Sequence, residues 1–419
     1  MKRDPSLSAR KSLAAALPCV APGNDGWLAL QSLLGNAGPA TAPRRAAAVR
    51  LDRCGAELRR GRPLVLATAQ GGLLVAAVET LSQAMWQRLM RIDTSTRLLL
   101  SADRLQALEE RHGAGTDEPA RGPDGAPQAP APLPLPPDIT FAQLQQLAAV
   151  TSGPGDAAAL GAPQAATDET PAWSAALTLC KQSRLIPALL LVALPPGSET
   201  ALEASQVLRF DPADVSLASP GRAAALYRVS DARVPLAAEE NCTLVLFREL
   251  DGDAEHVAII VGQPPSDAPV PVRLHSACLT GDLLGSLRCD CGPQLQRAVA
   301  LLAQTGGVLL YLAQEGRGTG LANKLRAYRL QDSGLNTLEA DRYLGFREDE
   351  RDFAAAAAML QALGHTRIQL LTNNPQKIEA LRQAGIEVVD RLALHGGMNT
   401  HNERYIRTKQ QAGHLAGDD

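Results

Sequence analysis

The spacing of hydrophobic and polar positions changes along this chain near residue 224. Beyond that point, short apolar runs alternate with amphipathic stretches, and glycine-rich turns separate them. This alternation is typical of an α/β or α+β enzyme domain. From the apolar runs and the helical periodicity we predict strands at 308–312 and 368–371, and helices at 321–331, 351–363 and 375–383.

The first half of the chain shows a weaker pattern of the same kind. Residues 64–68 (LVLAT) and 73–89 predict strand and helix segments of a small α/β unit. The apolar stretch 173–194 is typical of a helix followed by a strand, and we expect it to pack back on that unit. Lys181 lies within this stretch, and we expect its ammonium group to be solvated.

Shifts in composition suggest the domain boundaries. We predict a disordered N-terminus over 1–44, and a main domain over 225–419. Between them, 45–205 is expected to form a smaller domain, interrupted by the Pro/Ala/Gly-rich linker 113–137. A second stretch of linker composition covers 152–170. The predicted fold class is therefore α+β, with a C-terminal mixed α/β domain preceded by a smaller α/β domain.

Composition and charge exclude several classes of protein. Hydrophobic residues make up 45% and charged residues 20%, which is typical of a globular protein, and a net charge of -3 favours neither nucleic acid nor a membrane as partner. No run of about 18 apolar residues predicts a membrane-spanning helix. Seven cysteines, an odd number with three clustered, do not suggest a disulfide framework. We expect a cytoplasmic protein.

The clustered cysteines are the strongest chemical signal. Cys278, Cys289 and Cys291 form a Cys-x10-Cys-x-Cys pattern, and three thiolates are the ligand count of an open zinc site. One zinc ion bound there would lower the pKa of a water in the fourth position to about 7. The alternative is a set of incidental buried thiols. His275 is a candidate fourth ligand, a group that orients substrate, or a core residue.

Glycine-rich and basic segments suggest an anion site. The stretch 314–320 (QEGRGTG) follows a predicted strand and precedes a helix, where backbone N–H groups suit a phosphate and Arg317 adds charge. Glycine also serves turn geometry alone. In the next helix Lys324, Arg326 and Tyr328 share about one and a half turns with Arg329, which we interpret as solvated.

Two further segments carry polar groups at predicted element ends. Asp349 and Arg351 stand at the expected start of a helix, where they supply a proton acceptor and a phosphate-binding cation, although acidic residues also favour helix starts through the macrodipole. Thr372 and Lys377 flank Asn373 and Asn374 at a strand end before a proline, a position that suits a polar ligand or a capping turn.

Four motifs taken in order give the chain a family resemblance. They are HSACLTGDLLGSLRCDCG, QEGRGTGLANKLRAYRLQD, REDERDF and LLTNNPQK, and they resemble GTP cyclohydrolase II, the first enzyme of riboflavin biosynthesis, over roughly residues 225–415. The resemblance implies hydrolysis of GTP that opens the imidazole ring and releases formate and pyrophosphate. The implied product is 2,5-diamino-6-ribosylamino-pyrimidinone 5'-phosphate, and a homodimer is implied too.

The resemblance also assigns roles to residues. Cys278, Cys289 and Cys291 match the zinc ligands, Asp349 the proton acceptor, and Arg351 a residue proposed to attack the α-phosphorus. Because a guanidinium group stays protonated, a phosphate clamp is the conservative role for Arg351. Mg²⁺ beside the triphosphate stays open. Tyr328 matches an active-site tyrosine, and the implied GTP contacts are Arg273, Leu274, His275, Ser276, Gln294, Glu315, Gly316, Arg317, Thr337, Thr372 and Lys377.

Departures from the family pattern leave alternatives open. Ala277 stands where the family usually has Glu, Ala313 where it has Arg, and Thr319 where it has Ile. Losing a charged substrate contact costs on the order of 2 kcal/mol in binding. One alternative is therefore an enzyme that takes another purine nucleotide or stops at a formamido product. A non-catalytic nucleotide sensor or scaffold is another.

The N-terminal half resembles, more faintly, dihydroxybutanone phosphate synthase. Residues 57–82 have the outline of that enzyme's first strands. The acidic cluster that such a synthase uses to bind metal and sugar phosphate is replaced here by ATAQGG at 67–72. Because carboxylates are the usual ligands of hard divalent cations, we expect no metal site there. We interpret 45–205 as a degenerate, non-catalytic domain with a structural or regulatory role.

Overall fold

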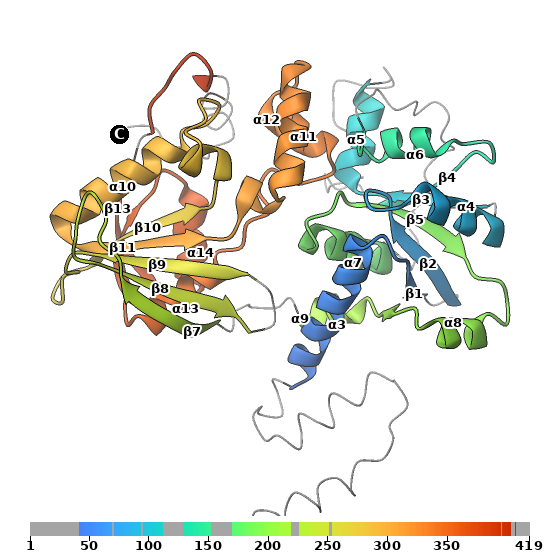
Figure 1. The fold of residues 1–419 in the computed structure, drawn as a ribbon, viewed down its shortest axis with the longest axis horizontal. Coiled ribbons are helices and arrows are strands. Elements are labelled where there is room, and N and C mark those ends of the chain that lie inside the picture. The colour runs from blue at the N-terminus through green and yellow to red at the C-terminus, as the bar shows by residue number, and fades with distance from the viewer. Residues whose placement is uncertain are drawn as a thin grey trace, which may run out of the picture.

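The structure is a computed structural model. It describes residues 42–68, 71–93, 95–111, 129–151, 170–218, 226–250, 254–394, 396–403 and 407. The predicted disordered segment 1–44 lies outside these ranges, apart from its last residues, which begin helix α3. Figure 1 shows two lobes, each built on its own sheet, with helices α11 (Leu321–Asp332) and α12 (Thr337–Tyr343) between them.

The N-terminal lobe is built on a six-stranded sheet in the order β4-β3-β5-β2-β1-β6. Neighbouring strands run antiparallel, except β1 and β6. The strands are β1 (Leu64–Thr68), β2 (Gly71–Ala77), β3 (Arg97–Leu100), β4 (Ala131–Pro134), β5 (Ala188–Ala193) and β6 (Arg209–Phe210). The helices are α3 (Ala42–Arg59), α4 (Gln83–Ile92), α5 (Ala102–Arg111), α6 (Phe141–Leu147), α7 (Thr170–Gln182), α8 (Glu199–Ser205) and α9 (Ala213–Ala218).

Two predictions about this lobe need correction. Residues 131–134, within the predicted linker 113–137, form the edge strand β4, which pairs with β3. Edge strands tolerate proline because they need hydrogen bonds on one side only. The lobe also continues past the predicted end at residue 205, since β6 pairs with β1. The helix and strand predicted over 173–194 are confirmed as α7 and β5, and β5 lies inside this sheet.

The C-terminal lobe is built on a seven-stranded sheet in the order β13-β12-β10-β11-β9-β8-β7. Strands β10 to β13 form its parallel part, and the remaining neighbours are antiparallel. The strands are β7 (Leu226–Arg233), β8 (Cys242–Glu249), β9 (Glu255–Val261), β10 (Val270–Ser276), β11 (Gly307–Leu312), β12 (Arg367–Leu371) and β13 (Glu387–Leu392). Besides α11 and α12, the helices are α10 (Cys291–Thr305), α13 (Ala354–Ala362) and α14 (Pro375–Gln383), with short turns η2 (Leu279–Leu283) and η3 (Glu315–Gly318).

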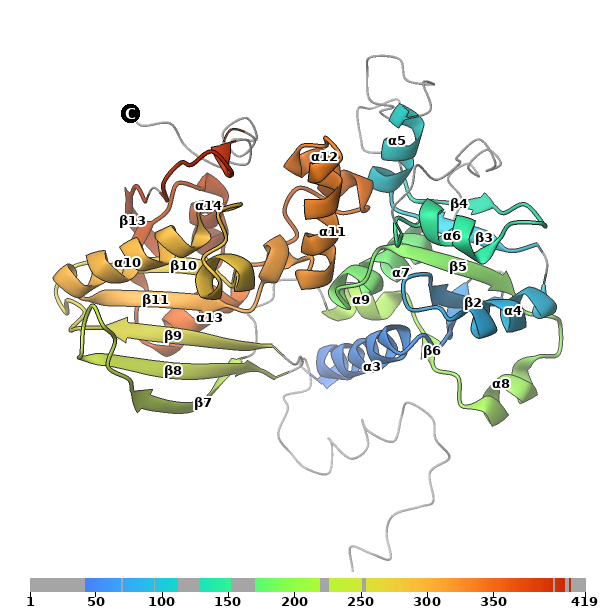
Figure 2. The ribbon, with the colours of Figure 1, turned by 45° about the horizontal axis from the view of Figure 1, so that its top comes forward.

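Helices cover both faces of this sheet. On one face Leu310 and Leu370 pack in a buried cluster with Leu381 of α14. On the other face Leu309 packs with Leu302 of α10. Because both faces are covered, the central strand β11 (GVLLYL) is uniformly apolar, as the sequence pattern suggested. The predicted fold class, α+β with two mixed domains, is confirmed (Figure 2).

Strand β10 marks the place where the chain reverses direction across the sheet. It lies between β11 and β12 and runs parallel to both. The connection from β10 leads to β11 on one side, and the chain later returns to β12 on the other. In open α/β sheets, ligands bind outside the carboxyl ends of strands at such a switch point. The fold therefore places the candidate site there before any side chain is considered.

Most predicted elements of this lobe are confirmed, and one boundary is wrong. The predicted strands correspond to β11 and β12, and two predicted helices to α11 and α14. The helix predicted from Arg351 begins only at Ala354. Asp349 Oδ1 accepts a hydrogen bond from Arg351 N at 3.0 Å, and Asp352 Oδ1 accepts one from Ala354 N at 2.8 Å. These side chains close turns, so Asp349 and Arg351 lie in a loop.

The two lobes meet through a buried cluster and several polar contacts. Arg104 of α5 is 1% exposed, and its guanidinium lies 4.0 Å from the ring centroid of Tyr343 and donates to that residue's carbonyl at 2.9 Å. The expectation that Lys181 is solvated was wrong, since its Nζ lies 2.7 Å from Glu350 Oε1. The cluster, called here the interlobe cluster, comprises Ala107, Ala149, Ala327, Ala340, Tyr343, Leu344 and Phe346.

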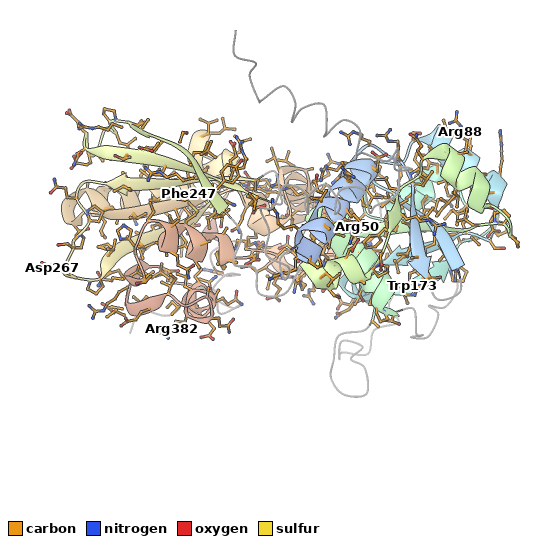
Figure 3. The ribbon with its side chains drawn as sticks, turned by 90° about the horizontal axis from the view of Figure 1, so that it is seen from below. Arg50, Arg88, Trp173, Phe247, Asp267 and Arg382 are labelled. Carbon is orange, nitrogen blue, oxygen red and sulfur yellow. The ribbon has the colours of Figure 1, made fainter. Side chains whose placement is uncertain are left out.

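Figure 3 shows the two lobes from below, with Trp173 in the N-terminal core and Phe247 in the C-terminal core. Each lobe thus has its own hydrophobic core. Among the described helices, none is both long enough and apolar enough to cross a membrane.

Candidate metal and nucleotide site

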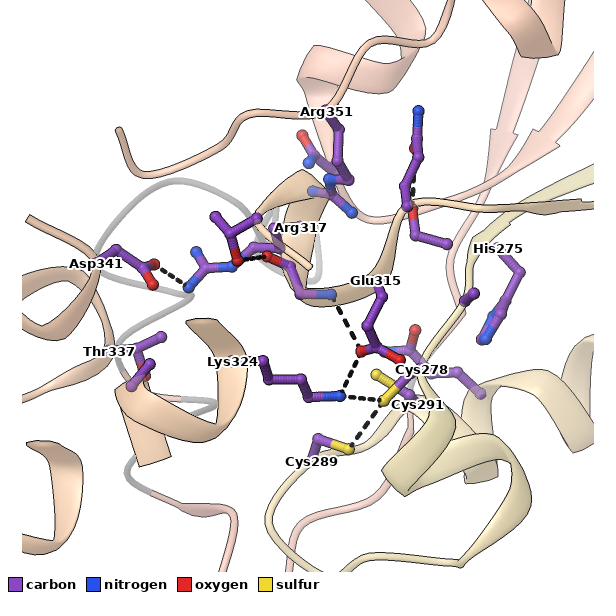
Figure 4. Close-up of a pocket in the computed structure, with 18 of the residues that line it drawn as sticks. His275, Cys278, Cys289, Cys291, Glu315, Arg317, Lys324, Thr337, Asp341 and Arg351 are labelled. Atoms are coloured by element: carbon purple, nitrogen blue, oxygen red, sulfur yellow. Dashed lines mark hydrogen bonds and ion pairs between the residues drawn. The ribbon is translucent and has the colours of Figure 1, made fainter. Parts of the chain in front are cut away.

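A single cavity gathers most of the predicted site residues. It opens beyond the carboxyl ends of β10, β11 and β12 and is closed by α11 and α12 (Figure 4). Leu274 and Asp349 do not line it. Leu274 has a buried side chain, and its carbonyl accepts a hydrogen bond from Lys377 Nζ at 2.9 Å. The predicted residues that do line the cavity are Arg273, His275, Ser276, Cys278, Cys289, Cys291, Gln294, Glu315, Gly316, Arg317, Tyr328, Thr337, Arg351, Thr372 and Lys377.

The cysteine thiols come together at the floor of this cavity. The sulfurs of Cys278, Cys289 and Cys291 lie within 4.8 Å of one another, and those of Cys278 and Cys289 are 3.8 Å apart. All are free thiols. Sulfurs at these separations can bind one tetrahedral zinc ion and leave a fourth position open. Within the described residues, this is the one cluster of potential metal ligands.

Gly281 makes room for the thiols. A side chain at this position would put its Cβ 2.9 Å from Cys289 Sγ and 3.0 Å from Cys278 Sγ. Such separations are too short for real side chains, so only glycine allows the turn after Cys278 to close over the sulfurs. The turn is thus shaped around a space between the thiols, and the donor set fits a zinc ion.

Asp282 holds this turn in place and was not among the predicted site residues. Its carboxylate accepts hydrogen bonds from Cys278 N at 2.9 Å and from Tyr311 Oη at 3.0 Å. It also contacts His275 Nε2 at 3.0 Å, which places this ring beside Asp282 and outside the thiol cluster. Burial lowers the pKa of His275, although the nearby Asp282 acts in the opposite direction. The lowered pKa favours a neutral imidazole. The spacing of Asp282 from Cys278 within one turn was the available signal.

Lys324 is the second residue whose role the sequence did not reveal. Its Nζ lies 3.0 Å from Cys278 Sγ and 2.7 Å from Glu315 Oε1. Hydrogen bonds from Cys289 and Cys291, together with Lys324, hold the pKa of Cys278 well below that of an ordinary thiol, although burial acts in the opposite direction. Cys278 is therefore held as a thiolate, which is the metal-binding form.

The glycine-rich turn presents Arg317 to the cavity. Arg317 has φ 58°, an uncommon conformation for a residue with a side chain, and such strain is concentrated at functional sites. Its Nη1 donates to Glu348 O at 2.8 Å, and its Nη2 lies 2.5 Å from Asp341 Oδ2. Burial raises the pKa of Asp341 to about 6, despite Arg317. Asp341 was not predicted, and no sequence signal pointed to it.

Buried polar atoms without a protein partner also mark the cavity. Across the described residues, three buried side-chain nitrogens have no hydrogen-bond partner: Arg273 Nε, His275 Nδ1 and Arg342 Nε. Two of these belong to cavity-lining residues. Burial lowers the pKa of Arg273 to about 10, so its charge is retained at neutral pH. Since buried polar atoms normally have partners, this pattern is typical of a ligand site.

Asp349 and Arg351 form an ion pair beside the cavity. Arg351 Nη2 lies 2.5 Å from Asp349 Oδ2, and both side chains are 12% exposed. Burial alone would raise the pKa of Asp349, but the hydrogen bonds and charge of Arg351 hold it below its ordinary value. Arg351 lines the main cavity, whereas Asp349 lines a neighbouring hollow. The carboxylate is therefore ionised, as a proton acceptor must be.

The remaining predicted residues divide between two cavities. Tyr328 lines the main cavity, where Arg288 Cζ lies 4.7 Å from its ring centroid, and burial raises the pKa of its phenol. Ala277 also lines this cavity, but Ala313 lines a second cavity of about 650 Å³ between the lobes. The family resemblance led us to expect Glu at position 277, so Ala277 bears directly on the candidate site, whereas Ala313 does not.

Comparison with known proteins identifies the family. The GTP cyclohydrolase II family profile matches residues 227–393. GTP cyclohydrolase-2 of Azospirillum brasilense is 41% identical over 383 residues, which are 90% of this chain and 96% of the relative. The chain belongs to the GTP cyclohydrolase II family. A GTP cyclohydrolase-2 of Xylella fastidiosa (strain 9a5c) is 39% identical over 88% of this chain and 87% of its own length.

Other relatives match a smaller share of the chain. GTP cyclohydrolase-2 of Azotobacter vinelandii (strain DJ / ATCC BAA-1303) is 56% identical over 39% of this chain and 79% of the relative. Among solved structures, a two-domain 3,4-dihydroxy-2-butanone 4-phosphate synthase from A. baumannii covers 83% of this chain at 17% identity, with a TM-score of 0.27. That score does not establish a shared fold, so the resemblance of the N-terminal half stays a prediction.

Proposed function

We propose that this chain hydrolyses GTP in a zinc-dependent reaction that opens the imidazole ring and releases formate and pyrophosphate. The product would be 2,5-diamino-6-ribosylamino-pyrimidinone 5'-phosphate, in the first step of riboflavin biosynthesis. The observation that carries the proposal is the cavity itself. It brings three thiols and the side chains of Arg273, Arg317, Arg351 and Lys377 together at the carboxyl ends of the parallel strands of the sheet. A polyanionic nucleotide needs such charges beside the reacting ring.

The cations would hold the triphosphate. Arg317 and Arg351 line the mouth of the cavity from two loops, and Lys377 stands at the start of α14. A guanidinium group binds phosphate oxygens in a bidentate manner. We therefore assign Arg351 the role of a clamp on the phosphate chain. When phosphate engages the guanidinium of Arg351, the Asp349 carboxylate would lose that contact, keep the backbone hydrogen bond from Arg351 N, and become more available to accept a proton.

Cys278, Cys289 and Cys291 would hold the zinc ion, and Lys324 would balance their negative charge. When bound, zinc supplies Lewis acidity and activates water for attack on the purine ring. The chain's own residues orient the reaction. Tyr328 and Glu315 line the same cavity and supply a hydroxyl and a carboxylate for contacts to the base. Any Mg²⁺ that accompanies the triphosphate would be held largely by the phosphate oxygens.

Two further properties belong to the proposal. A cytoplasmic location agrees with the free thiols of the described cysteines. A homodimer agrees with exposed leucines beside the site, since Leu283, Leu284 and Leu287 are 73%, 69% and 57% exposed. Exposed apolar patches of this kind mark protein contacts.

Product identification tests the proposed function. Zinc-loaded protein is incubated with GTP, and formate, pyrophosphate and the pyrimidine are followed by mass spectrometry, with and without a zinc chelator. We expect all three products, and their loss on chelation. Intact GTP after incubation with fully zinc-loaded protein overturns the proposal.

Ala277 motivates a second candidate, an enzyme of the same chemistry that acts on another purine nucleotide or stops at a formamido product. This residue lines the cavity where the family usually carries a charged side chain. The same assay with several purine nucleotides distinguishes the two. Turnover of GTP alone to the deformylated product excludes the second candidate.

A further inference from the structure

The N-terminal lobe contacts the loop that carries Asp349 and Arg351. Lys181, at the end of α7, reaches across the lobe boundary to Glu350, with its Nζ 2.7 Å from Oε1. The two side chains are 18% and 9% exposed. Because both side chains are mostly buried, salt screens this ion pair less than an exposed surface pair.

Glu350 is the point where several parts of this loop are joined. Its Oε1 also accepts a hydrogen bond from Arg347 N at 2.9 Å, and its Oε2 accepts one from Arg347 Nη2 at 2.8 Å. Its own backbone N–H donates to Arg317 O at 3.2 Å. One residue thus connects the N-terminal lobe, the start of the loop and the glycine-rich turn of the candidate site.

The position of Glu350 in the chain makes this contact relevant to the chemistry. It lies between Asp349 and Arg351 in the sequence. The side chains of these two residues pair with each other and line a hollow beside the main cavity. The Glu350 side chain faces Lys181 and the second cavity. Adjacent residues share a backbone, so a shift of Glu350 moves both of its neighbours.

The electrostatics of Glu350 favour a fixed loop. Burial alone would raise its pKa, but the hydrogen bonds from Arg347 and the charge of Lys181 hold that pKa below its ordinary value. The carboxylate is therefore ionised in a mostly buried place. Removing one partner of a buried ion pair leaves a charge that must move toward water or another donor. Without Lys181, Glu350 would keep its bonds to Arg347 of the same loop, but the loop would lose its ion pair to the N-terminal lobe.

We propose that Lys181 of the N-terminal lobe is a positioning residue for the loop that carries Asp349 and Arg351. The N-terminal lobe then has a defined task in catalysis, because it fixes the geometry of groups that belong to the other lobe. The proposal deepens the proposed function and rests on it for the roles of Asp349 and Arg351.

The test compares the full-length, zinc-loaded wild type with three variants. Lys181→Met removes the charge, Lys181→Arg keeps it, and Glu79→Gln is the matched control. Glu79 also forms an ion pair across the lobe boundary, with Arg326 Nη1 at 2.8 Å, but does not contact the loop. Two quantities are measured: kcat and KM for GTP, and hydrogen exchange of backbone amides in 345–353. Thermal melts establish that each variant is folded.

We expect Lys181→Met to lower kcat about tenfold or more, since small misplacements of reacting groups have large effects on rate. KM for GTP should rise as well, because the same loop carries Arg351, and exchange in 345–353 should become faster. Lys181→Arg should restore both quantities, and Glu79→Gln should leave exchange in this loop unchanged.

Unchanged exchange in the loop of Lys181→Met overturns the proposal, whatever the activity. Equal effects of Lys181→Met and Glu79→Gln on exchange also overturn it, because they would indicate general loosening of the lobes. If the wild type does not turn over GTP but the exchange pattern is as expected, the proposed function fails while the positioning contact is supported.

Discussion

The two lobes are each built on a mixed sheet, but the sheets differ in which residues follow their strands. In the C-terminal lobe, β10, β11 and β12 run parallel, and the loops that follow them meet in the cavity of the candidate site. In the N-terminal lobe almost all neighbouring strands are antiparallel, so successive loops leave from opposite edges. Strand direction therefore decides which lobe concentrates polar groups.

The two lobes also differ in whether the buried atoms of their charged side chains have partners within the protein. In the N-terminal lobe, Arg50 Nη2 pairs with Asp214 Oδ1 at 2.5 Å and completes a local contact. In the C-terminal lobe, the buried Arg273 and His275 each keep a side-chain nitrogen with no protein partner. A satisfied buried pair indicates structure, whereas unsatisfied buried atoms around a cavity indicate a ligand.

The largest expected effect comes from the thiols. Cys289→Ser should lower the rate of formate release about a thousandfold or more, because zinc contributes several kcal/mol of transition-state stabilisation. Cys54→Ser is the matched control in the N-terminal lobe, where burial raises the pKa of the thiol to about 12 and no cluster forms. Formate release and zinc content are measured together. Equal losses in both variants would contradict the assignment.

A change to the glycine-rich turn should have the next largest effect. Arg317→Met should raise KM for GTP about thirtyfold or more, since a lost charged contact costs roughly 2 kcal/mol or more. The matched change is Arg62→Met, an exposed cation of the N-terminal lobe that pairs only locally with Glu57. Steady-state kinetics on both variants make the comparison. An unchanged KM in Arg317→Met would remove this residue from the binding site.

A smaller effect is expected at Asp282. Asp282→Asn should weaken zinc binding about tenfold, because groups that orient metal ligands have effects of that size. Competition with a chromogenic chelator measures the affinity. Asp214→Asn is the control, since it also removes a buried carboxylate but lies in the other lobe. Zinc affinity that stays at the wild-type value in Asp282→Asn would restrict this residue to local folding.

The last expected effect concerns the stability of the fold against pH, and it involves neither zinc nor GTP. Because the pKa of Asp341 is raised to about 6 from 3.8, the folded protein holds this proton more tightly than the unfolded chain. Asp341 therefore makes the folded state less stable as pH rises from about 4 to 6, and Asp341→Asn should lack this loss. We expect the variant to gain on the order of 2 kcal/mol over the wild type between pH 4 and pH 7. Denaturant unfolding at both pH values measures it, and a pH-independent difference would contradict the assignment.

The sequence predicted the parts of the site that lie in ordered local motifs. Cysteine spacing identified the thiol cluster, and the turn at 314–320 identified the approach to Arg317. Strands β11 and β12 and helices α11 and α14 were also predicted, because their apolar positions are regularly spaced, whereas β7 to β10, β13, α10 and α12 were not predicted. The helix start at Ala354 was missed because Asp349 and Asp352 close turns instead of opening a helix.

Contacts between distant segments could not be predicted. Lys181 was expected to be solvated because its own segment offers no partner, and Glu350 lies 169 residues away. Asp341 and Lys324 likewise acquire their roles from side chains on other elements. Local pattern determines the element on which a residue lies, but only packing determines what its charged end meets.

The interlobe cluster has a consequence for dividing the chain. Tyr343, Leu344 and Phe346 are 3%, 2% and 1% exposed in the complete protein, and they pack with Ala107 and Ala149 of the other lobe. A fragment that ended at the lobe boundary would present this apolar surface to water and favour aggregation. Each lobe thus has its own hydrophobic core, but each also covers an apolar surface of the other. Excision of either lobe would expose that surface to water.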